Sequence, residues 1–136
     1  MEPVQINLWG VLAATAFAMV VGAIWYSQPV LGKTWQKLVG KSQEELTKSA
    51  GQVYLITLLC WLLASYVLAL FVQYVAADTW VEGAVTGFWI WAGFVFPTNV
   101  IHTLFAGRSK KLVAIDLGYT VVSMIGMGII LVLLPN

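Results

Sequence analysis

Residues 112–134 read LVAIDLGYTVVSMIGMGIILVLL, and this stretch decides the fold class. It is apolar along almost its whole length and contains a single charged side chain, that of Asp116. An α-helix rises about 1.5 Å per residue, so about 20 apolar residues are enough to cross the roughly 30 Å of hydrocarbon in a bilayer. The stretch therefore predicts a transmembrane helix.

Three other stretches have similar length and apolar character. Residues 6–27 and 53–77 carry no charge, and residues 84–106 are uncharged at neutral pH. Together the four stretches cover most of the 136 residues and leave little chain for a soluble domain. We predict an all-α, polytopic membrane protein in which residues 1–136 form one domain of four transmembrane helices.

The composition excludes most soluble classes of protein. Only 10% of the residues are charged and 60% are hydrophobic, whereas soluble domains carry roughly 25% charged residues. The net charge is only +1, so a nucleic-acid partner is not expected. Because Cys60 is the only cysteine, the chain contains no intrachain disulfide and no paired-cysteine metal or redox motif.

The basic residues predict the orientation. All seven Lys and Arg residues lie either in residues 28–52 or in the short connection between the third and fourth predicted helices. Lys and Arg close to the ends of membrane helices stay on the cytoplasmic side. We therefore predict that both termini lie outside the cytoplasm.

The longer connection, residues 28–52, is patterned. Apolar residues recur in it at helical spacing, from Leu31 to Val39, while lysines occupy another face. An apolar stripe beside lysines suits the surface of an anionic leaflet, so we predict an amphipathic interfacial helix around residues 31–41, with membrane lipids as partners. A solvated linker helix that only orients the first two spans is the alternative. The residues expected at lipid headgroups are Lys33, Trp35, Lys37 and Lys41.

A second short helix should follow in the same connection. Ser42 and Glu45 have the spacing of a capping box, in which the hydroxyl caps the helix and the carboxylate returns to the backbone N–H of the serine. This pattern predicts a helix that begins at about residue 43.

Small residues predict where helices approach one another. In lipid, helices associate through close backbone contact rather than by hiding apolar area. Glycines and alanines at helical spacing therefore indicate packing faces, and hinges in a moving transporter are the alternative. The residues concerned are Gly10, Ala14, Ala18, Gly22, Gly83, Gly87, Ala114, Gly118, Gly126 and Gly128.

Polar residues gather near the inner ends of the last two predicted helices. His102 and Asp116 should lie at similar depth on adjacent antiparallel helices, where they can reach each other. Pro97 lacks an N–H and displaces the carbonyl of Gly93, which permits a kink above them. The candidate polar cluster consists of Tyr26, Ser27, Asn99, His102, Asp116, Tyr119 and Thr120.

Three interpretations of this cluster are open. It can be a transport site built beside a broken helix, or an interhelical network of His102, Asp116 and Asn99 that holds the last two helices together. Asp116 can also turn toward the surface and pair with Lys110 or Lys111. One histidine and one carboxylate are too few ligands for a metal, haem ligation by His102 has no support, and we expect no cofactor. No nucleophile stands beside a base, so we expect no catalytic residue and no enzyme.

The stretch GAIWYSQPVLGKTW, residues 22–35, resembles the bacterial family catalogued as domain of unknown function 1761. Later stretches agree with it, namely GFWIW with GF at residues 87–94, LF, GR and KL within residues 104–112, and DLGY at residues 116–119. Gln28 separates Ser27 from Pro29, where the family more often runs Ser directly into Pro. The resemblance implies a small multi-pass protein of the bacterial cytoplasmic (inner) membrane, and it implies no activity.

Two functional hypotheses follow from these patterns. In the first, the chain is a structural or accessory membrane subunit that forms a homo-oligomer or joins a larger complex, since its small-residue faces suggest further partners. In the second, it is a small transporter or channel for protons, cations or a small solute that uses Asn99, His102 and Asp116.

Overall fold

The computed structural model describes residues 4–134, and four apolar helical segments in it are long enough to cross a membrane. Three of them are continuous α-helices, α1 (Leu8–Trp25), α4 (Ala50–Tyr74) and α7 (Lys110–Leu133). The third span, Trp80–Ala106, is assembled from α5 (Trp80–Ile90), a π-helical turn η2 (Trp91–Val95) and α6 (Phe96–Ala106). No strand occurs among the described residues. The predicted all-α, four-helix membrane fold is confirmed.

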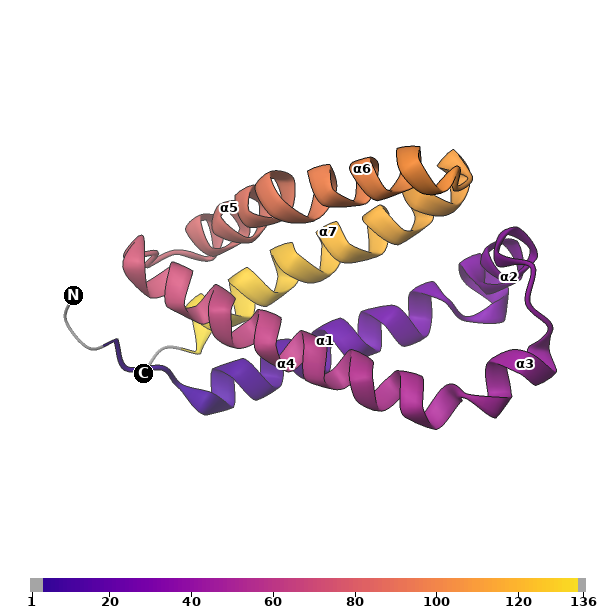
Figure 1. Ribbon diagram of the computed structural model, residues 1–136. Coiled ribbons are helices and arrows are strands. Elements are labelled where there is room, and N and C mark those ends of the chain that lie inside the picture. Colours follow the sequence, from indigo (N-terminus) through magenta and orange to yellow (C-terminus); the bar gives the residue numbers. More distant parts are fainter. Residues whose placement is uncertain (1–3, 135–136) are drawn as a thin grey trace.

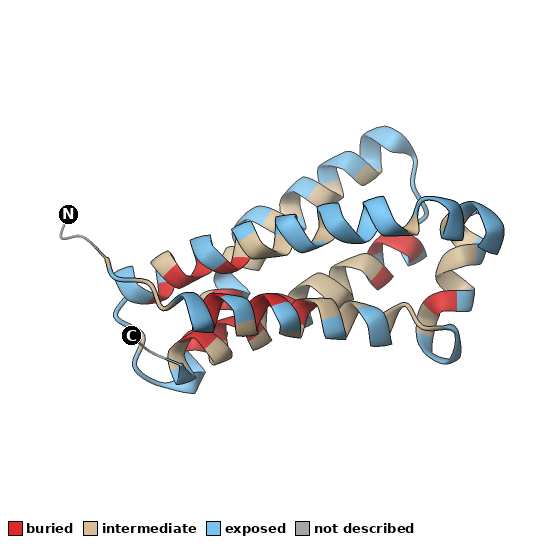
Figure 2. Cartoon of the chain, turned by 90° about the horizontal axis from the view of Figure 1, so that it is seen from below, coloured by how far each residue is buried: buried red, intermediate tan, exposed pale blue. Residues whose placement is uncertain are grey.

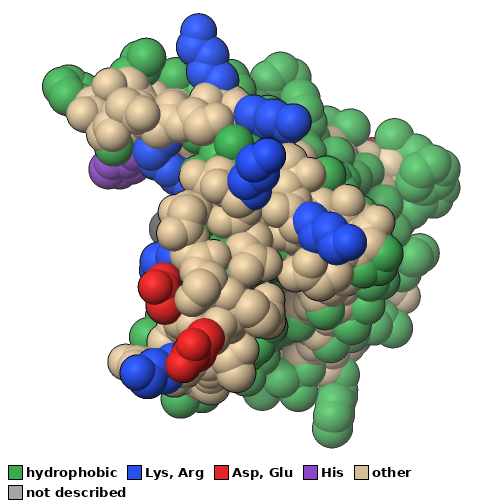
Figure 3. All heavy atoms as spheres, turned by 90° about the vertical axis from the view of Figure 1, so that its right-hand side faces the viewer, with side chains coloured by type: hydrophobic (Ala, Val, Ile, Leu, Met, Phe, Trp, Pro, Cys, Tyr) green, Lys and Arg blue, Asp and Glu red, His purple; other side chains and the backbone are tan. Residues whose placement is uncertain are grey.

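The helices run back and forth between two ends of the molecule (Figure 1). The start of α1, the end of α7 and the connection from α4 to α5 lie at one end, and the connection from α6 to α7 lies at the other. Three short elements also lie at that second end, namely the π-helical turn η1 (Gln28–Gly32), α2 (Lys33–Val39) and α3 (Gln43–Lys48). Figure 3 shows Lys and Arg side chains gathered on this end, as the distribution of basic residues predicts. Which end faces the cytoplasm stays a prediction.

Local sequence features mark where the short elements begin and end. A helical segment is present where the interfacial helix is expected, but it starts earlier than predicted, with η1 at Gln28 and Pro29 in its first turn. Its location at a membrane surface stays a prediction. Gly40 ends α2 in the left-handed region, with φ 74°, which favours glycine. The Ser42 hydroxyl accepts from the Glu45 N–H at 3.2 Å and so caps α3. A capping box with both of its hydrogen bonds is formed elsewhere, between Thr79 and Glu82 at the start of α5.

The main apolar cluster lies in the half of the molecule that is nearer the termini, where most of the buried residues appear in Figure 2. It is contributed by residues 11–18 of α1 and by the second halves of α4 and α7. By contrast, residues 50–64 of α4 include no buried residue. The cluster consists of Val11, Ala14, Ala18, Leu68, Ala69, Val72, Met124, Met127 and Leu131.

Glycines let α5 approach α7 closely. A Cβ added to Gly83 would meet the Gly128 carbonyl, and one added to Gly87 would meet the Met124 carbonyl. Conversely, a Cβ on Gly128 would meet the Gly83 carbonyl. These glycines are packing positions, as expected for helices that associate through small residues.

The interruption of the third span takes the form of a π-helical turn. The Phe96 N–H donates to the Trp91 carbonyl, five residues earlier, and Pro97 follows in the first turn of α6. Proline cannot donate to the helix ladder and clashes with the preceding turn, and one widened turn is a known way to accommodate such a residue. Beyond it, α6 contains no buried residue.

The orientation can be tested by thiol labelling in intact cells. In a Cys60→Ser background, Asp78→Cys should react with a membrane-impermeant maleimide, whereas Gln43→Cys should react only after the membrane is permeabilised. The reason is that basic segments stay on the cytoplasmic side. The opposite labelling pattern would mean that the topology is inverted.

The close contact between α5 and α7 can be tested at Gly87. Overpacking costs typically about 1–3 kcal/mol, so we expect Gly87→Ala to lower the free energy of unfolding in detergent by about that amount. Gly93→Ala is the matched control in the same span, because a Cβ there meets nothing within 4 Å. Equal destabilisation by the two variants would contradict a tight contact at Gly87.

Candidate functional site

Asp116 of α7 is held by two donors. The Tyr26 hydroxyl donates to its Oδ1 at 2.7 Å, and the Arg108 guanidinium forms an ion pair with its Oδ2 at 3.1 Å. The side chains of Arg108 and Asp116 are 37% and 25% exposed, so neither member of the ion pair is fully buried. Tyr26 directly follows α1, and Arg108 lies in the connection from α6 to α7. The carboxylate therefore ties the C-terminal end of α1 and the connection from α6 to α7 to the helix α7 itself.

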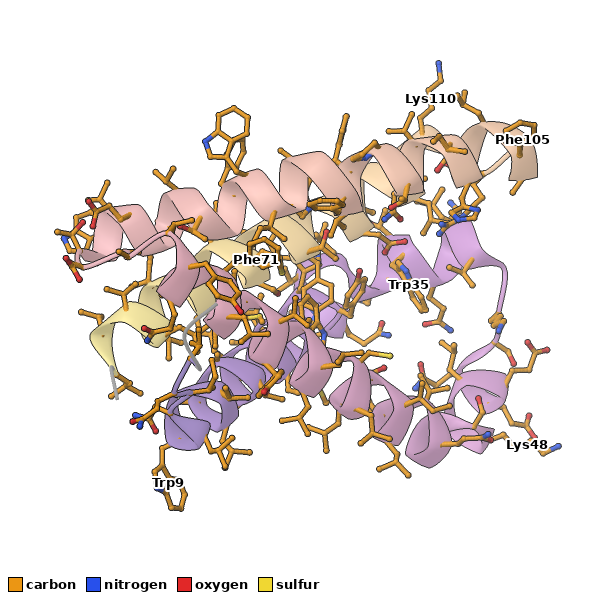
Figure 4. All side chains as sticks on the ribbon, turned by 60° about the vertical axis from the view of Figure 1, so that its left-hand side comes forward. Trp9, Trp35, Lys48, Phe71, Phe105 and Lys110 are labelled. Atoms are coloured by element: carbon orange, nitrogen blue, oxygen red, sulfur yellow. The ribbon has the colours of Figure 1, made fainter. Side chains whose placement is uncertain are left out.

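Aromatic rings continue from Tyr26 in two directions. Its ring meets Trp35 of α2 edge to face, with centroids 5.5 Å apart, and meets Tyr119 of α7 at 5.3 Å. Tyr119 in turn meets Trp61 of α4 at 5.7 Å. Edge-to-face pairs at such distances are favourable beyond the area they bury. The four rings connect α1, α2, α4 and α7, and Figure 4 shows Trp35 extending from α2 toward the other helices.

The Tyr119 hydroxyl is both an acceptor and a donor. It accepts from the Trp61 indole N–H at 2.8 Å and donates to the Ala18 carbonyl at 3.1 Å. Gly22 leaves room for it, because a Cβ at that position would lie 2.8 Å from the hydroxyl oxygen. Gly22 of α1 thus accommodates a ring of α7.

Indole N–H groups of two other spans also donate to α7. Trp25 donates to the Ile115 carbonyl at 3.0 Å, and Trp91 donates to the Thr120 hydroxyl at 2.9 Å. Each of the other three spans therefore places at least one tryptophan donor on the segment Ile115 to Thr120, which reads IDLGYT. We call this segment the acceptor segment.

The structure brings only part of the predicted polar cluster together. Tyr26, Asp116, Tyr119 and Thr120 are joined through the acceptor segment and its partners. Ser27 instead donates to the Ile24 carbonyl at 2.6 Å, a contact within its own turn.

The expected network of His102, Asp116 and Asn99 is not formed in the described chain. His102 is exposed and makes no hydrogen bond or ion pair within residues 4–134, and the Asn99 amide donates to the Val95 carbonyl of its own helix at 2.9 Å. The ion-pair partner of Asp116 is Arg108 rather than Lys110 or Lys111. Gly107 ends α6 in the left-handed region, with φ 64°, and the chain turns back so that Arg108 reaches Asp116.

Polar side chains beside the π-helical turn bond to its carbonyls. The Thr98 hydroxyl donates to the Phe94 carbonyl at 2.6 Å, and Val95 receives the Asn99 amide. These bonds satisfy backbone oxygens near the interruption at Pro97. Asn99, which the sequence singles out as part of a possible site, thus bonds to the backbone of its own span.

The sequence interpretation missed Arg108, Trp25, Trp61 and Trp91 as members of the site. A usable signal exists for the tryptophans, since an indole N–H inside a bilayer needs an acceptor. Among residues 4–134, no group of three or more His, Cys, Asp and Glu side chains is placed to hold a metal ion.

These observations define the class of the protein, a multi-pass membrane protein whose polar side chains gather on one helix. The chain belongs to the family described as "Protein of unknown function (DUF1761)", which it matches over residues 9–132. The resemblance read from the sequence is therefore confirmed over nearly the whole chain. Comparisons with curated proteins and with solved structures found no match.

The contribution of the Tyr26 hydroxyl can be measured directly. Tyr26→Phe keeps the ring and removes the donor to Asp116. Hydrogen bonds to charged groups contribute about 1.5–3 kcal/mol, and we expect a loss of unfolding free energy near the lower end, since the carboxylate keeps Arg108 and is 25% exposed.

Tyr54→Phe is the control for this measurement. Tyr54 is 64% exposed, and its hydroxyl makes no hydrogen bond within the described residues. Its replacement should change the stability by less than about 0.5 kcal/mol. If the two variants behave alike, the hydroxyl of Tyr26 does not hold Asp116.

Proposed function

We propose that the chain is a structural or accessory subunit of the bacterial cytoplasmic membrane that assembles with further copies of itself or with a larger complex. In this proposal it is not an enzyme. The observation that carries the proposal is a contrast between two parts of the molecule. The polar groups around the acceptor segment are occupied by one another, whereas α6 contains no buried residue and bears an imidazole without a partner in the described chain.

The polar contacts support a structural role for the acceptor segment. Asp116 is neutralised by Arg108, and its Oδ1 is occupied by Tyr26. Neither of two surface concavities, one near Asn7 and one beside α2, is lined by Asp116 or His102. A carboxylate that is already paired has less capacity to bind a cargo ion than a free one.

The surface of α6 supports assembly. Phe105, Leu104 and Ile101 are 91%, 75% and 52% exposed, and Figure 4 shows Phe105 at the far end of α6. Lipid can cover these apolar side chains, but it offers an imidazole N–H few partners. A neighbouring helix with a polar group facing His102 would satisfy it, and such contacts hold membrane helices together.

The test combines mass and position. In mild detergent, light scattering should give a protein mass well above that of one 14.9 kDa chain. In a Cys60→Ser background, a benzophenone maleimide on Ile101→Cys should crosslink in native membranes, whereas Ile56→Cys on α4 should crosslink much less. Both positions are 52% exposed in this chain and lie toward the same end of the molecule, so they are a matched pair.

Two outcomes would contradict the subunit proposal. One is a single-chain mass with no protein co-purifying. The other is equal crosslinking at both positions, which would mean that α6 has no special role in assembly.

The alternative of a small transporter or channel keeps one observation in its favour. Interrupted helices with π-helical turns are frequent at functional sites, and η2 with Pro97 is such an interruption in the third span. In this alternative, proton or cation flux in reconstituted vesicles would be lost in His102→Ala and Asp116→Asn. Under the subunit proposal these variants change stability or assembly, and the vesicles show no flux that depends on them.

A further inference from the structure

An open concavity of ≈ 460 Å³ lies beside α2 and the turn that leads to α3. Every side chain that lines it is a cation or a hydrogen-bonding group, with Gly40 as the remaining residue. Its lining consists of Lys33, Gln36, Lys37, Gly40, Lys41 and Ser42.

The backbone brings the three lysines to this one place. Lys33 and Lys37 are one helical turn apart on α2 and therefore share a face. Gly40 then adopts the left-handed conformation, which ends the helix and turns the chain, and Lys41 borders the same concavity. Without this turn, Lys41 would continue along the axis of α2.

The charge of the lysines is not neutralised by the chain itself. The three side chains are exposed and make no ion pair within residues 4–134. Glu44 and Glu45, the nearest acids in the sequence, lie in the first turn of α3 and do not line the concavity. The Ser42 hydroxyl accepts from the Glu45 N–H and keeps its own proton to donate. The concavity thus offers positive charge and donors, which is the chemistry that a phosphate group requires.

The position of the concavity indicates a lipid as the source of that phosphate. Trp35, on α2, packs against Tyr26 at the inner end of α1, so the lysines are held at the end of the membrane spans. Next to α3, residues 50–64 of α4 are mostly apolar and include no buried residue. Val53 and Leu55 there are 53% and 57% exposed, and a lipid whose headgroup sits at the lysines can lay its acyl chains along such a surface.

We propose that this concavity binds the phosphate of an anionic phospholipid headgroup. Lys33, Lys37 and Lys41 surround the phosphate, and Ser42 donates a hydrogen bond to it. The site orders the connection between α1 and α4 on the membrane surface. This role is independent of the proposed assembly through α6.

The experiment compares two triple variants of the full chain. The first, Lys33→Gln/Lys37→Gln/Lys41→Gln, removes the cations of the concavity. The second, Lys48→Gln/Lys110→Gln/Lys111→Gln, removes the same charge from the same end of the molecule and leaves the concavity intact. Binding of phosphatidylglycerol and phosphatidylcholine is measured by native mass spectrometry and by thermal unfolding in mixed micelles.

We expect the wild-type chain to bind phosphatidylglycerol more tightly than phosphatidylcholine. The first triple variant should weaken phosphatidylglycerol binding by about tenfold or more, since each lysine near an anionic surface contributes appreciably. The second should weaken it by less than about threefold. Both variants should unfold at the wild-type temperature in phosphatidylcholine, because all the replaced side chains are exposed.

Three results would overturn the proposal. A wild-type chain without preference for the anionic lipid would do so, and so would equal losses in the two triple variants, which would mean a diffuse charge effect. The third is competition by inorganic phosphate at millimolar concentration that displaces the lipid completely, since the concavity would then bind a free anion rather than a headgroup.

Discussion

The hydrocarbon core of a bilayer holds no water to accept a hydrogen bond, so an indole or phenol buried there needs an acceptor from the protein. In this chain the acceptors are concentrated in one place. Trp25, Trp61 and Trp91 come from three different spans, and each donates to the backbone or a side chain of the acceptor segment of α7. Because the rotation of a helix about its axis decides where an indole points, these three bonds define how α1, α4 and the third span are rotated toward α7.

Large aromatic rings can pack at the acceptor segment only where a glycine leaves room for them. A Cβ on Gly118 would lie 2.7 Å from Cζ2 of Trp25, and a Cβ on Gly22 would meet the Tyr119 hydroxyl. Each of these glycines therefore stands opposite an aromatic side chain that donates to a neighbouring helix. Gly83, Gly87 and Gly128 differ, since a Cβ on any of them would meet the backbone of the facing helix. The same residue type thus serves two kinds of contact in one small bundle.

The sequence predicts the spans well because their signal is local. A run of apolar residues, a capping serine such as Ser42 and a cluster of lysines can each be recognised without knowing what lies opposite. The partner of Asp116 is not a local property. Counting residues from the end of a helix gives the depth of a side chain, and by this count His102 and Asp116 lie at the same depth. Successive residues differ by about 100° around the axis, so equal depth does not mean that the two side chains face each other. The π-helical turn before Pro97 and the left-handed Gly107 alter that direction further, and Arg108 becomes the partner.

Different interactions hold the two halves of the bundle together, and this difference explains why parts of α4 and α6 are left uncovered. Nearer the termini, an apolar cluster and the glycine contacts of α5 bring the helices together. Toward the basic end, α7 keeps its neighbours through directed hydrogen bonds, and those bonds engage only the helices that present a donor. All of α6 and residues 50–60 of α4 present none to α7 and include no buried residue. The rest of the bundle therefore leaves the surfaces of these two segments uncovered, and lipid or a further helix can lie against them.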